Sequence, residues 1–363
     1  MRAIVVRRYG PPEVLEWRDV PDPKPGPGQV LIRVKAVGIN FADLLARLGV
    51  YSNTPKPPFV PGLEIAGEVE EAVGRTQEPE GGRREAGGGR QKASGLPAPS
   101  VSFAAGDRVA ALSRFNAYAE RVVVNAEQVF PIPAAMSFEE AAAIPVNYLT
   151  AWQSMFEMGN LRRGDRILIT SAAGGVGVAA VQLARARGLI TFGTAGPSKQ
   201  DFLRQMGVDH PIDYTREKFR DVVRRVAPEG IEMALDAVGG KSYAESYKCL
   251  GPMGRLVVYG FSTVVGPKGK ISYLHGAKEM LQTPRFHPLK LIDRNIAVIG
   301  VHIGKLGHKS SVMKEQLEEI FRMYQSGRVK PVVGKTFPLA EAGSAHRYIH
   351  DRKNLGKVVL LAG

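Results

Sequence analysis

The segment that decides the fold is Arg166-Ile-Leu-Ile-Thr-Ser-Ala-Ala-Gly-Gly-Val-Gly-Val-Ala-Ala-Val-Gln-Leu-Ala184, an apolar run that breaks into a glycine-rich turn and continues as an alanine-rich helical pattern. Residues 167–169 predict a buried parallel strand, and the residues from Val176 onward predict a helix. A strand, a glycine-rich turn and a helix in this order hold the diphosphate of a dinucleotide at the helix N-terminus. The segment therefore predicts a dinucleotide-binding domain.

The turn carries the pattern Ala172-x-Gly174-x-x-Gly177. Gly174 lets the backbone approach the phosphates, and Gly177 lets the helix pack closely on the strand. Ala172 stands where the usual pattern has its first glycine, so a plain surface turn is the alternative interpretation. The flanking strand and helix favour the dinucleotide site. We expect the diphosphate to contact the backbone of Ala173, Gly174, Gly175, Val176 and Gly177.

Composition places the chain among ordinary globular proteins. Its 363 residues are enough for two domains, and 44% are hydrophobic while 23% are charged. The single cysteine, Cys249, excludes a disulfide framework within the chain and a cysteine-based zinc cluster, which agrees with a cytoplasmic location. The first residues are too short an apolar run for a signal peptide, and no run of 18 apolar residues predicts a membrane span.

The net charge of +14 raises the question of nucleic-acid binding. Lysine and arginine are scattered along the chain in stretches of mixed sign, such as residues 216–225, and no basic block is interleaved with aromatic residues. We therefore expect no specific nucleic-acid partner. A basic surface would still attract an anionic dinucleotide.

The hydrophobic pattern changes along the chain. Up to about residue 124, short β-prone runs separated by Pro/Gly turns predict a barrel or sandwich, with strands at 3–6, 30–37, 65–70, 108–112 and 118–124. From Ser137 onward, helices alternate with apolar strands, which predicts βαβ units and a doubly wound parallel sheet. Its expected strands are 167–170, 190–193, 233–236, 256–259 and 297–301.

Two further segments complete this organisation. The tail shows helices near 312–326 and 340–350 and a last strand at 357–361, and we expect it to return to the first domain. Residues 76–102 contain few large apolar side chains, so they cannot bury enough surface to offset the entropy of ordering. They are predicted to be a disordered loop inserted between two strands.

Several motifs together carry a family resemblance. They are Gly38-Ile-Asn-Phe-Ala-Asp43, Pro61-Gly-Leu-Glu-Ile-Ala-Gly67, Ala105-Gly-Asp-Arg-Val109, Pro145-Val-Asn-Tyr-Leu-Thr-Ala-Trp152, His210-Pro-Ile-Asp-Tyr214, Gly266-Pro-Lys268 and Asn354-Leu-Gly-Lys-Val-Val359. The sequence resembles the medium-chain dehydrogenase/reductase superfamily, within it the zinc-free quinone oxidoreductase branch, and looks closest to its vesicle amine transport protein 1-like members.

The resemblance implies an α/β protein with a GroES-like β-barrel catalytic domain, residues 1–148 and 305–363, and a doubly wound Rossmann domain, residues 149–304. It also implies NADPH as the hydride donor and a homodimer joined through Rossmann edge strands. Zinc-dependent relatives have a cysteine where Asn40 stands and a histidine where Leu63 stands. An amide and an aliphatic side chain cannot replace those ligands, so no metal is expected.

The end of the second Rossmann strand bears on the choice of cofactor. Thr194, Ala195 and Gly196 offer no carboxylate for a ribose 2′-OH, and Ser198 and Lys199 follow at once. A missing carboxylate beside a cation favours a 2′-phosphate and therefore NADPH over NADH. The alternative is that Lys199 is a solvated residue in the first turn of a helix.

Other cofactor contacts are carried over by resemblance. Tyr214 matches a tyrosine beside the 2′-phosphate, although it could simply pack at a strand end. Loops at the carboxyl ends of parallel strands are where ligands of open α/β sheets bind, and plain turns are the alternative. The contacts expected there and nearby are Thr150, Val238, Gly239, Gly260, Phe261, Ser262, Val301, His302, Arg352 and Asn354. His302 could equally be a sheet-edge histidine, and Arg352 a surface arginine.

Asn40 and Tyr51 are the candidates for the chemistry. Hydride transfer to an electron-poor carbon needs a group that donates a hydrogen bond to the acceptor oxygen as negative charge develops. Asn40 replaces a metal ligand and should face the cleft, although it could also cap a short helix over residues 42–48. Tyr51 would reach the same space and pass a proton, whereas Asp43 is expected to fix the loop.

The sequence thus predicts an NADPH-dependent, zinc-independent oxidoreductase acting on a small electrophile, either a quinone or an α,β-unsaturated carbonyl compound. Without a Lewis acid to stabilise an alkoxide, reduction of an activated acceptor is a better expectation than alcohol oxidation. One alternative is an enoyl-thioester reductase. The other is a low-turnover NADPH-binding protein with lipid or RNA partners.

Overall fold

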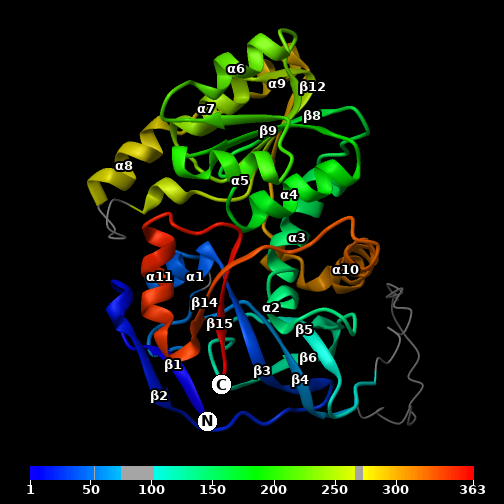
Figure 1. Cartoon of the computed structure of the whole chain (residues 1–363). Helices are drawn as coiled ribbons and strands as arrows, with labels where there is room; N and C mark the ends of the chain where they lie inside the picture. The colour runs from blue at the N-terminus through cyan, green and yellow to red at the C-terminus, as the bar shows by residue number, and fades with distance from the viewer. Residues whose placement is uncertain (53, 75–101, 266–272) are drawn as a thin grey trace, which may run out of the picture.

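A computed structural model describes residues 1–52, 54–74, 102–265 and 273–363 of the chain. Figure 1 shows two lobes, with a parallel sheet and its helices above and a second, mainly antiparallel sheet below. The expected loop at residues 76–102 lies outside the described residues except for Ser102, and the motif at residues 266–268 lies outside them entirely.

The upper lobe is built on six parallel strands in the order β10-β9-β8-β11-β12-β13. Numbered along the chain this is the order 3-2-1-4-5-6, which is that of a dinucleotide-binding Rossmann sheet. The predicted α/β class and doubly wound sheet are therefore confirmed. The strands are β8 (Arg166–Ile169), β9 (Ile190–Ala195), β10 (His210–Asp213), β11 (Ile231–Asp236), β12 (Leu250–Val258) and β13 (Ala297–Gly300).

Helices connect these strands, as the right-handed βαβ unit requires. They are α4 (Gly175–Ala186), α5 (Gln200–Gln205), α6 (Phe219–Val226), α7 (Lys241–Lys248), α8 (Tyr273–Gln282) and α9 (Pro288–Arg294). In α4, residues 177–184 are all buried, and Ala180, Val181 and Leu183 belong to the same apolar cluster as Ile167 and Ile169 of β8. No helix among the described residues is long and apolar enough to cross a membrane.

The lower lobe contains a seven-stranded sheet in which β14-β15-β3-β4-β5-β7 are neighbours and β6 pairs with β3. The expected return of the tail is confirmed, since β15 pairs antiparallel with β3. These strands are β3 (Gln29–Ile39), β4 (Glu64–Ala72), β5 (Arg108–Leu112), β6 (Arg121–Asn125), β7 (Val129–Pro131), β14 (Val333–Pro338) and β15 (Lys357–Leu361), while β1 (Arg2–Val6) and β2 (Leu15–Asp19) form a separate pair. The helices are α1 (Phe41–Arg47), α2 (Phe138–Ala141), α10 (Ser310–Gln325) and α11 (Ala342–His350).

Helix α3 (Pro145–Trp152) lies between the two lobes (Figure 1). One apolar cluster extends from Ala36 and Ala66 in the lower sheet through Tyr148 and Leu149 of α3 to Ile167 in the upper sheet. The lobes are thus packed against each other through α3. The predicted domain boundary between residues 148 and 149 falls inside this helix and stays a prediction.

Candidate cofactor site and catalytic cleft

The glycine-rich turn joins β8 to α4 and leaves helix N–H groups at its mouth. Gly174 is the residue before the helix, and the N–H of Val178 donates to its carbonyl over 2.9 Å. The N–H groups of Gly175, Val176 and Gly177 precede that first intrahelical hydrogen bond, so they lie at the positive end of the helix dipole. This arrangement suits an anionic group such as a diphosphate.

Gly177 is a glycine for a steric reason. A Cβ placed on it would lie 2.4 Å from the carbonyl oxygen of Ser171 and 2.7 Å from Cα of Ala172. Both are backbone atoms and cannot turn away. Ala172 is accommodated because the opposing residue is also small, since a Cβ on Gly193 would lie 3.1 Å from that of Ala172. The N–H of Ala172 also donates to the Thr194 carbonyl over 3.0 Å, which ties the turn to β9.

The segment before β15 lies across this turn. The Gly356 N–H donates to the Ala173 carbonyl over 2.8 Å, and Gly174 and Gly356 form an isolated parallel bridge. Two residues earlier, the carbonyl of Asn354 accepts a hydrogen bond of 2.6 Å from the ammonium group of Lys199. Predicted contacts that are distant in the sequence are thus brought together at the carboxyl ends of the parallel strands.

Lys199 follows the end of β9 and senses the positive charge of Arg352. The pKa of Lys199 is lowered, mainly by its partial burial and then by the positive charge of Arg352. Within the described residues neither side chain has a carboxylate partner in an ion pair. Thr194 is buried at the strand end, and the hydroxyl of the exposed Tyr214 would lie 3.7 Å from a Cβ on Gly196. The site can therefore accept a further anionic group.

The loops after β11 and β12 are held together by hydrogen bonds. The N–H of Ser262 donates to the Ala237 carbonyl over 3.0 Å, and the Tyr243 hydroxyl donates to the Gly260 carbonyl. A Cβ on Gly239, whose φ is 91°, would lie 2.2 Å from the ring of Phe261. The predicted contacts Val238, Gly239, Gly260, Phe261 and Ser262 consequently lie side by side.

Asp236 organises these loops, a role that the sequence pattern does not reveal. It is buried at the end of β11, and its carboxylate accepts hydrogen bonds from the Val238 N–H at 2.8 Å, the Ser242 hydroxyl at 2.7 Å and the Ser246 hydroxyl at 2.6 Å. Satisfying a buried carboxylate in this way fixes the loop that carries Val238 and Gly239. The signal available in the sequence was the strand-end aspartate followed by two serines on α7.

Tyr51 and His302 meet where the two lobes face each other. Their ring centroids are 5.7 Å apart, and His302 Nε2 lies 3.5 Å from the Ser52 hydroxyl. Burial and the negative charge of Asp43 raise the pKa of Tyr51 to about 12, so its phenol keeps its proton at neutral pH. Partial burial lowers the pKa of His302, which favours the neutral ring. Val301, the residue before His302, is buried after β13, and Thr150 is buried on α3.

Asn40 stands at the N-terminus of α1, as the capping alternative expects. Its N–H donates to Asp43 Oδ2 over 2.7 Å. Its side-chain amide donates to the Gly38 carbonyl over 3.3 Å and to Glu64 Oε1 over 2.8 Å, while its Oδ1 accepts from the Lys357 ammonium over 2.7 Å. Both amide hydrogens therefore have partners within the protein. A direct role of Asn40 in catalysis stays a prediction.

Glu64 and Lys357 are residues to which the sequence assigned no function. They form an ion pair of 2.5 Å in which the lysine side chain is 2% exposed and the glutamate side chain is fully buried. Both stand in motifs that carry the family resemblance, in Pro61-Gly-Leu-Glu64 and in Gly356-Lys357. That position was the available signal. Among the described residues, no group of three or more His, Cys, Asp or Glu side chains could hold a metal ion.

A second buried acid lies behind Asn40. Asp43 Oδ2 accepts the Asn40 N–H and lies 3.4 Å from the Tyr118 hydroxyl, which in turn lies 3.0 Å from His346 Nε2. Asp43 Oδ1 is buried without a hydrogen-bond partner among the described residues. Desolvation raises the pKa of Asp43 to about 7, although the N–H of Asn40 and the charge of Lys357 oppose the shift.

This shift predicts that Asp43 makes the protein less stable as the pH rises. The unfolded aspartate loses its proton near pH 4 and the folded one near pH 7, so the contribution falls between these values and is constant above them. Between pH 5 and pH 8 the loss amounts to about 3 kcal/mol, and we expect Asp43→Asn to remove it. Urea unfolding at pH 5 and pH 8 measures it, with the exposed Asp107→Asn as control. An unchanged difference between the two pH values would show that Asp43 ionises normally.

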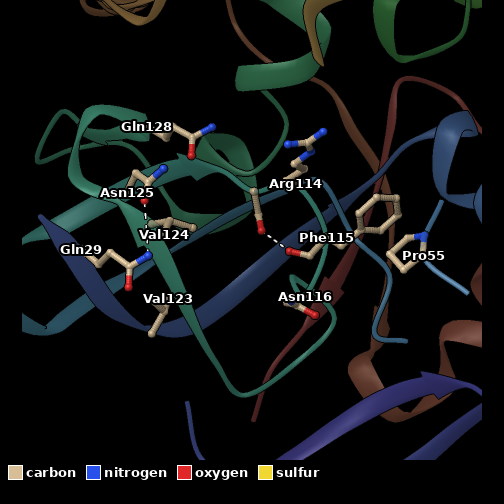
Figure 2. A pocket seen from close by; sticks show the side chains of 10 residues that line it. Gln29, Pro55, Arg114, Phe115, Asn116, Val123, Val124, Asn125 and Gln128 are labelled. Carbon is tan, nitrogen blue, oxygen red and sulfur yellow. Dashed lines mark hydrogen bonds between the residues drawn. The ribbon is translucent and has the colours of Figure 1, made fainter. Parts of the chain in front are cut away.

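Two surface pockets lie at different places relative to this site. Figure 2 shows one of about 430 Å³ on the lower lobe, where Gln29 and Asn125 are hydrogen-bonded at 3.3 Å and Arg114, Phe115 and Pro55 form the opposite side. It contains none of the predicted site residues. A second pocket, of about 350 Å³, contains none of them either, but it is lined by Pro197 and Gln200, which flank Ser198 and Lys199 in the sequence. Only the second therefore borders the candidate cofactor site.

Comparisons with known proteins agree with this architecture. Residues 26–134 match the alcohol dehydrogenase GroES-like domain family, and residues 206–360 match the zinc-binding dehydrogenase family. The chain is 38% identical to the synaptic vesicle membrane protein VAT-1 homolog of Homo sapiens, over 100% of this chain and 87% of that protein. It is 31% identical to the quinone oxidoreductase of Rattus norvegicus, over 99% of this chain and 98% of that protein.

A solved structure extends the comparison to three dimensions. The Escherichia coli quinone oxidoreductase complexed with NADPH has a TM-score of 0.81 and 26% identity, covering 99% of this chain and 100% of that one. The predicted GroES-like and Rossmann lobes are thus confirmed by family match and by fold. The chain therefore belongs to the medium-chain dehydrogenase/reductase superfamily of oxidoreductases, with VAT-1 homologues and quinone oxidoreductases among its relatives.

Proposed function

We propose that this oxidoreductase uses NADPH to reduce quinones or α,β-unsaturated carbonyl compounds and needs no zinc. The observation that carries the proposal is the hydrogen bond of 2.6 Å from Lys199 to the Asn354 carbonyl, which joins this lysine to the segment of Arg352 at the end of β9, where Thr194, Ala195 and Gly196 provide no carboxylate. A 2′-phosphate is the part of NADPH that NADH lacks, and two cations without a carboxylate partner among the described residues are a chemical match for it. The relative solved with NADPH supports the same choice.

The chain's own residues would hold NADPH across the carboxyl ends of the parallel strands. The N–H groups of Gly175, Val176 and Gly177 would bind the diphosphate, and Lys199 and Arg352 the 2′-phosphate. The loops around Gly239 and Phe261 would line the path to the cleft. NADPH supplies the hydride, and the reaction then needs an acceptor carbon held against the nicotinamide and a proton for the reduced product.

Tyr51 is suited to provide that proton. Its phenol is protonated at neutral pH, and a hydrogen bond from it would stabilise the negative charge that develops on the acceptor oxygen. The neutral ring of His302, next to it, would help to orient the tyrosine. The acceptor gains the hydride on carbon and the proton on oxygen or the neighbouring carbon, and the tyrosine recovers its proton from solvent.

A Tyr51→Phe variant should separate chemistry from binding. We expect kcat to fall about 100-fold, because loss of a general acid commonly costs this much, while the Kd for NADPH stays within about twofold. Stopped-flow absorbance and fluorescence titration measure the two quantities. Tyr9→Phe is the control, since the Tyr9 hydroxyl bonds the Pro55 carbonyl over 3.1 Å on the adjacent surface. Unchanged turnover in Tyr51→Phe would remove this residue from the mechanism.

A coenzyme oxidation screen tests the proposal as a whole. Purified protein is mixed with NADPH or NADH and a panel of quinones, enones and one enoyl thioester, with and without a zinc chelator. We expect oxidation of NADPH in preference to NADH with quinones or enones, unaffected by chelation. Tight NADPH binding without oxidation of any acceptor would instead indicate a low-turnover binding protein, and activity confined to the thioester would indicate an enoyl reductase. The homodimer and the cytoplasmic location stay predictions.

A further inference from the structure

The ion pair of Lys357 and Glu64 lies in a cage of oxygen atoms. The Lys357 ammonium lies 2.5 Å from Glu64 Oε1, 2.7 Å from Asn40 Oδ1 and 3.5 Å from Asn147 Oδ1. All four side chains are buried. An ammonium group has three hydrogens to donate, and here three oxygen atoms surround it, which leaves it in one orientation.

The cage connects four elements of the two lobes. Lys357 begins β15, Glu64 begins β4, Asn40 precedes α1, and Asn147 is on α3. The second oxygen of Glu64 accepts the N–H of Val146 over 2.7 Å, which fixes the first turn of α3. A displacement of any one of these elements would therefore stretch hydrogen bonds to a buried charge.

The same cage touches the glycine-rich turn at two points. Gly356, the residue before Lys357, donates its N–H to the Ala173 carbonyl over 2.8 Å. A Cβ on Gly175 would lie 2.6 Å from Nδ2 of Asn147, so the Asn147 amide packs against the start of α4. The path from the diphosphate turn to Asn40 is thus continuous through Asn147 and Lys357.

A buried ion pair is a poor source of stability, because the cost of removing two charges from water offsets much of their attraction. What such a pair can provide is a single well-defined arrangement of the groups around it, since any misplacement leaves a charge unpaired. Here those groups belong to the cofactor turn on one side and to the acceptor cleft on the other.

We propose that Lys357 is a positioning residue that couples the diphosphate turn to the Asn40 side of the cleft. The inference rests on the proposed function for the identity of the coenzyme and deepens it. Lys357 and Glu64 touch neither coenzyme nor acceptor in this role. They hold Asn147 against Gly175 and hold Asn40 in place, so seating of the coenzyme and the shape of the acceptor cleft depend on one another.

The test uses the double variant Lys357→Met with Glu64→Gln, because Lys357→Met alone would leave a buried carboxylate unpaired and could fail to fold. We expect the double variant to fold, to bind NADPH about tenfold more weakly and to turn over about tenfold more slowly once saturated, as for a positioning group displaced by a fraction of an ångström. Lys335→Met, an exposed lysine on the neighbouring strand β14, is the control and should change neither constant.

A double-mutant cycle that adds Gly175→Ala measures the coupling between Lys357 and the diphosphate turn. In the wild type, the added methyl group would push on Asn147 and weaken NADPH binding. In the Lys357→Met, Glu64→Gln background Asn147 loses its contact with Lys357 and keeps only the hydrogen bond of 3.2 Å to the Ala143 carbonyl, so the same change should have less than half of its effect on log Kd. Full additivity of the two changes, or a folded double variant with the Kd and kcat of the wild type, would overturn the proposal.

The two proposals fail differently. The proposed function is contradicted if the wild type binds NADPH but oxidises it with none of the acceptors tested. The Kd values of the wild type, the Gly175→Ala variant and the Lys357→Met, Glu64→Gln variants, measured by fluorescence titration, still decide whether Lys357 is coupled to the turn. Thermal unfolding of each variant identifies a merely structural role, in which the melting temperature falls while the Kd and the kcat of the folded fraction remain unchanged.

Discussion

Gly177→Ala is expected to abolish measurable NADPH binding and to destabilise the fold. The new Cβ would lie 2.4 Å from the Ser171 carbonyl oxygen, so α4 must move away from the end of β8. Overpacking of this kind costs about 1–3 kcal/mol of unfolding free energy. Because the shift displaces the N–H groups of Gly175 and Val176, we expect the Kd for NADPH to rise more than about 100-fold.

Two other glycines serve as controls for this result. A Cβ on Gly174 would lie 3.2 Å from the same oxygen, so Gly174→Ala should leave stability within about 1 kcal/mol of the wild type and weaken only NADPH binding. Gly276 lies in α8 with nothing within 4 Å of a Cβ, so Gly276→Ala should leave NADPH binding unchanged and raise stability by at most about 1 kcal/mol. Urea unfolding and fluorescence titration give both values. Wild-type affinity in Gly177→Ala would place the diphosphate somewhere other than this turn.

Lys199→Ala is expected to remove the preference for NADPH over NADH. A hydrogen bond to a charged group contributes about 1.5–3 kcal/mol, so NADPH should bind about 10- to 100-fold more weakly while NADH binding stays nearly unchanged. Arg352→Gln should have an effect in the same direction, and glutamine avoids a new strain at the Arg352 φ of 56°. Kd values for both coenzymes, measured at low and moderate salt, give the result.

The exposed Lys248→Ala is the matched control for a general loss of positive charge. If Lys199→Ala weakens NADPH and NADH equally, the lysine contacts a part that both coenzymes share. If it changes neither, Lys199 has only a structural role through its hydrogen bond to the Asn354 carbonyl.

The sequence was sufficient to predict the strand, turn and helix around Gly177, because local periodicity and glycine spacing act within twenty residues there. Strands β2 and β10 were harder. β2 is only partly buried and pairs with β1 alone, so it lacks a strong apolar alternation. β10 begins with His210-Pro211, and the proline weakens the strand pattern even though Ile212 is fully buried.

The candidate site was predictable where one segment determines it and unpredictable where distant segments meet. The missing carboxylate after Thr194 is visible in the sequence. The partners of Asn40 are not, because Lys357 lies 317 positions away and is brought close by the pairing of β15 with β3. The same reason hides the unpaired oxygen of Asp43, whose neighbour Tyr118 comes from the segment before β6.

The apolar cluster that crosses α3 also determines how the molecule could be recombined. Met313, Leu317 and Ile320 of α10 belong to it, and Gln153, just after α3, donates to Gln316 of α10 over 3.0 Å. Each lobe has an apolar cluster of its own, but this third cluster is shared between them. A chimera that exchanges the nucleotide-binding lobe with that of a relative must carry α3 and α10 along with it, or both halves would be left with an unfilled seam.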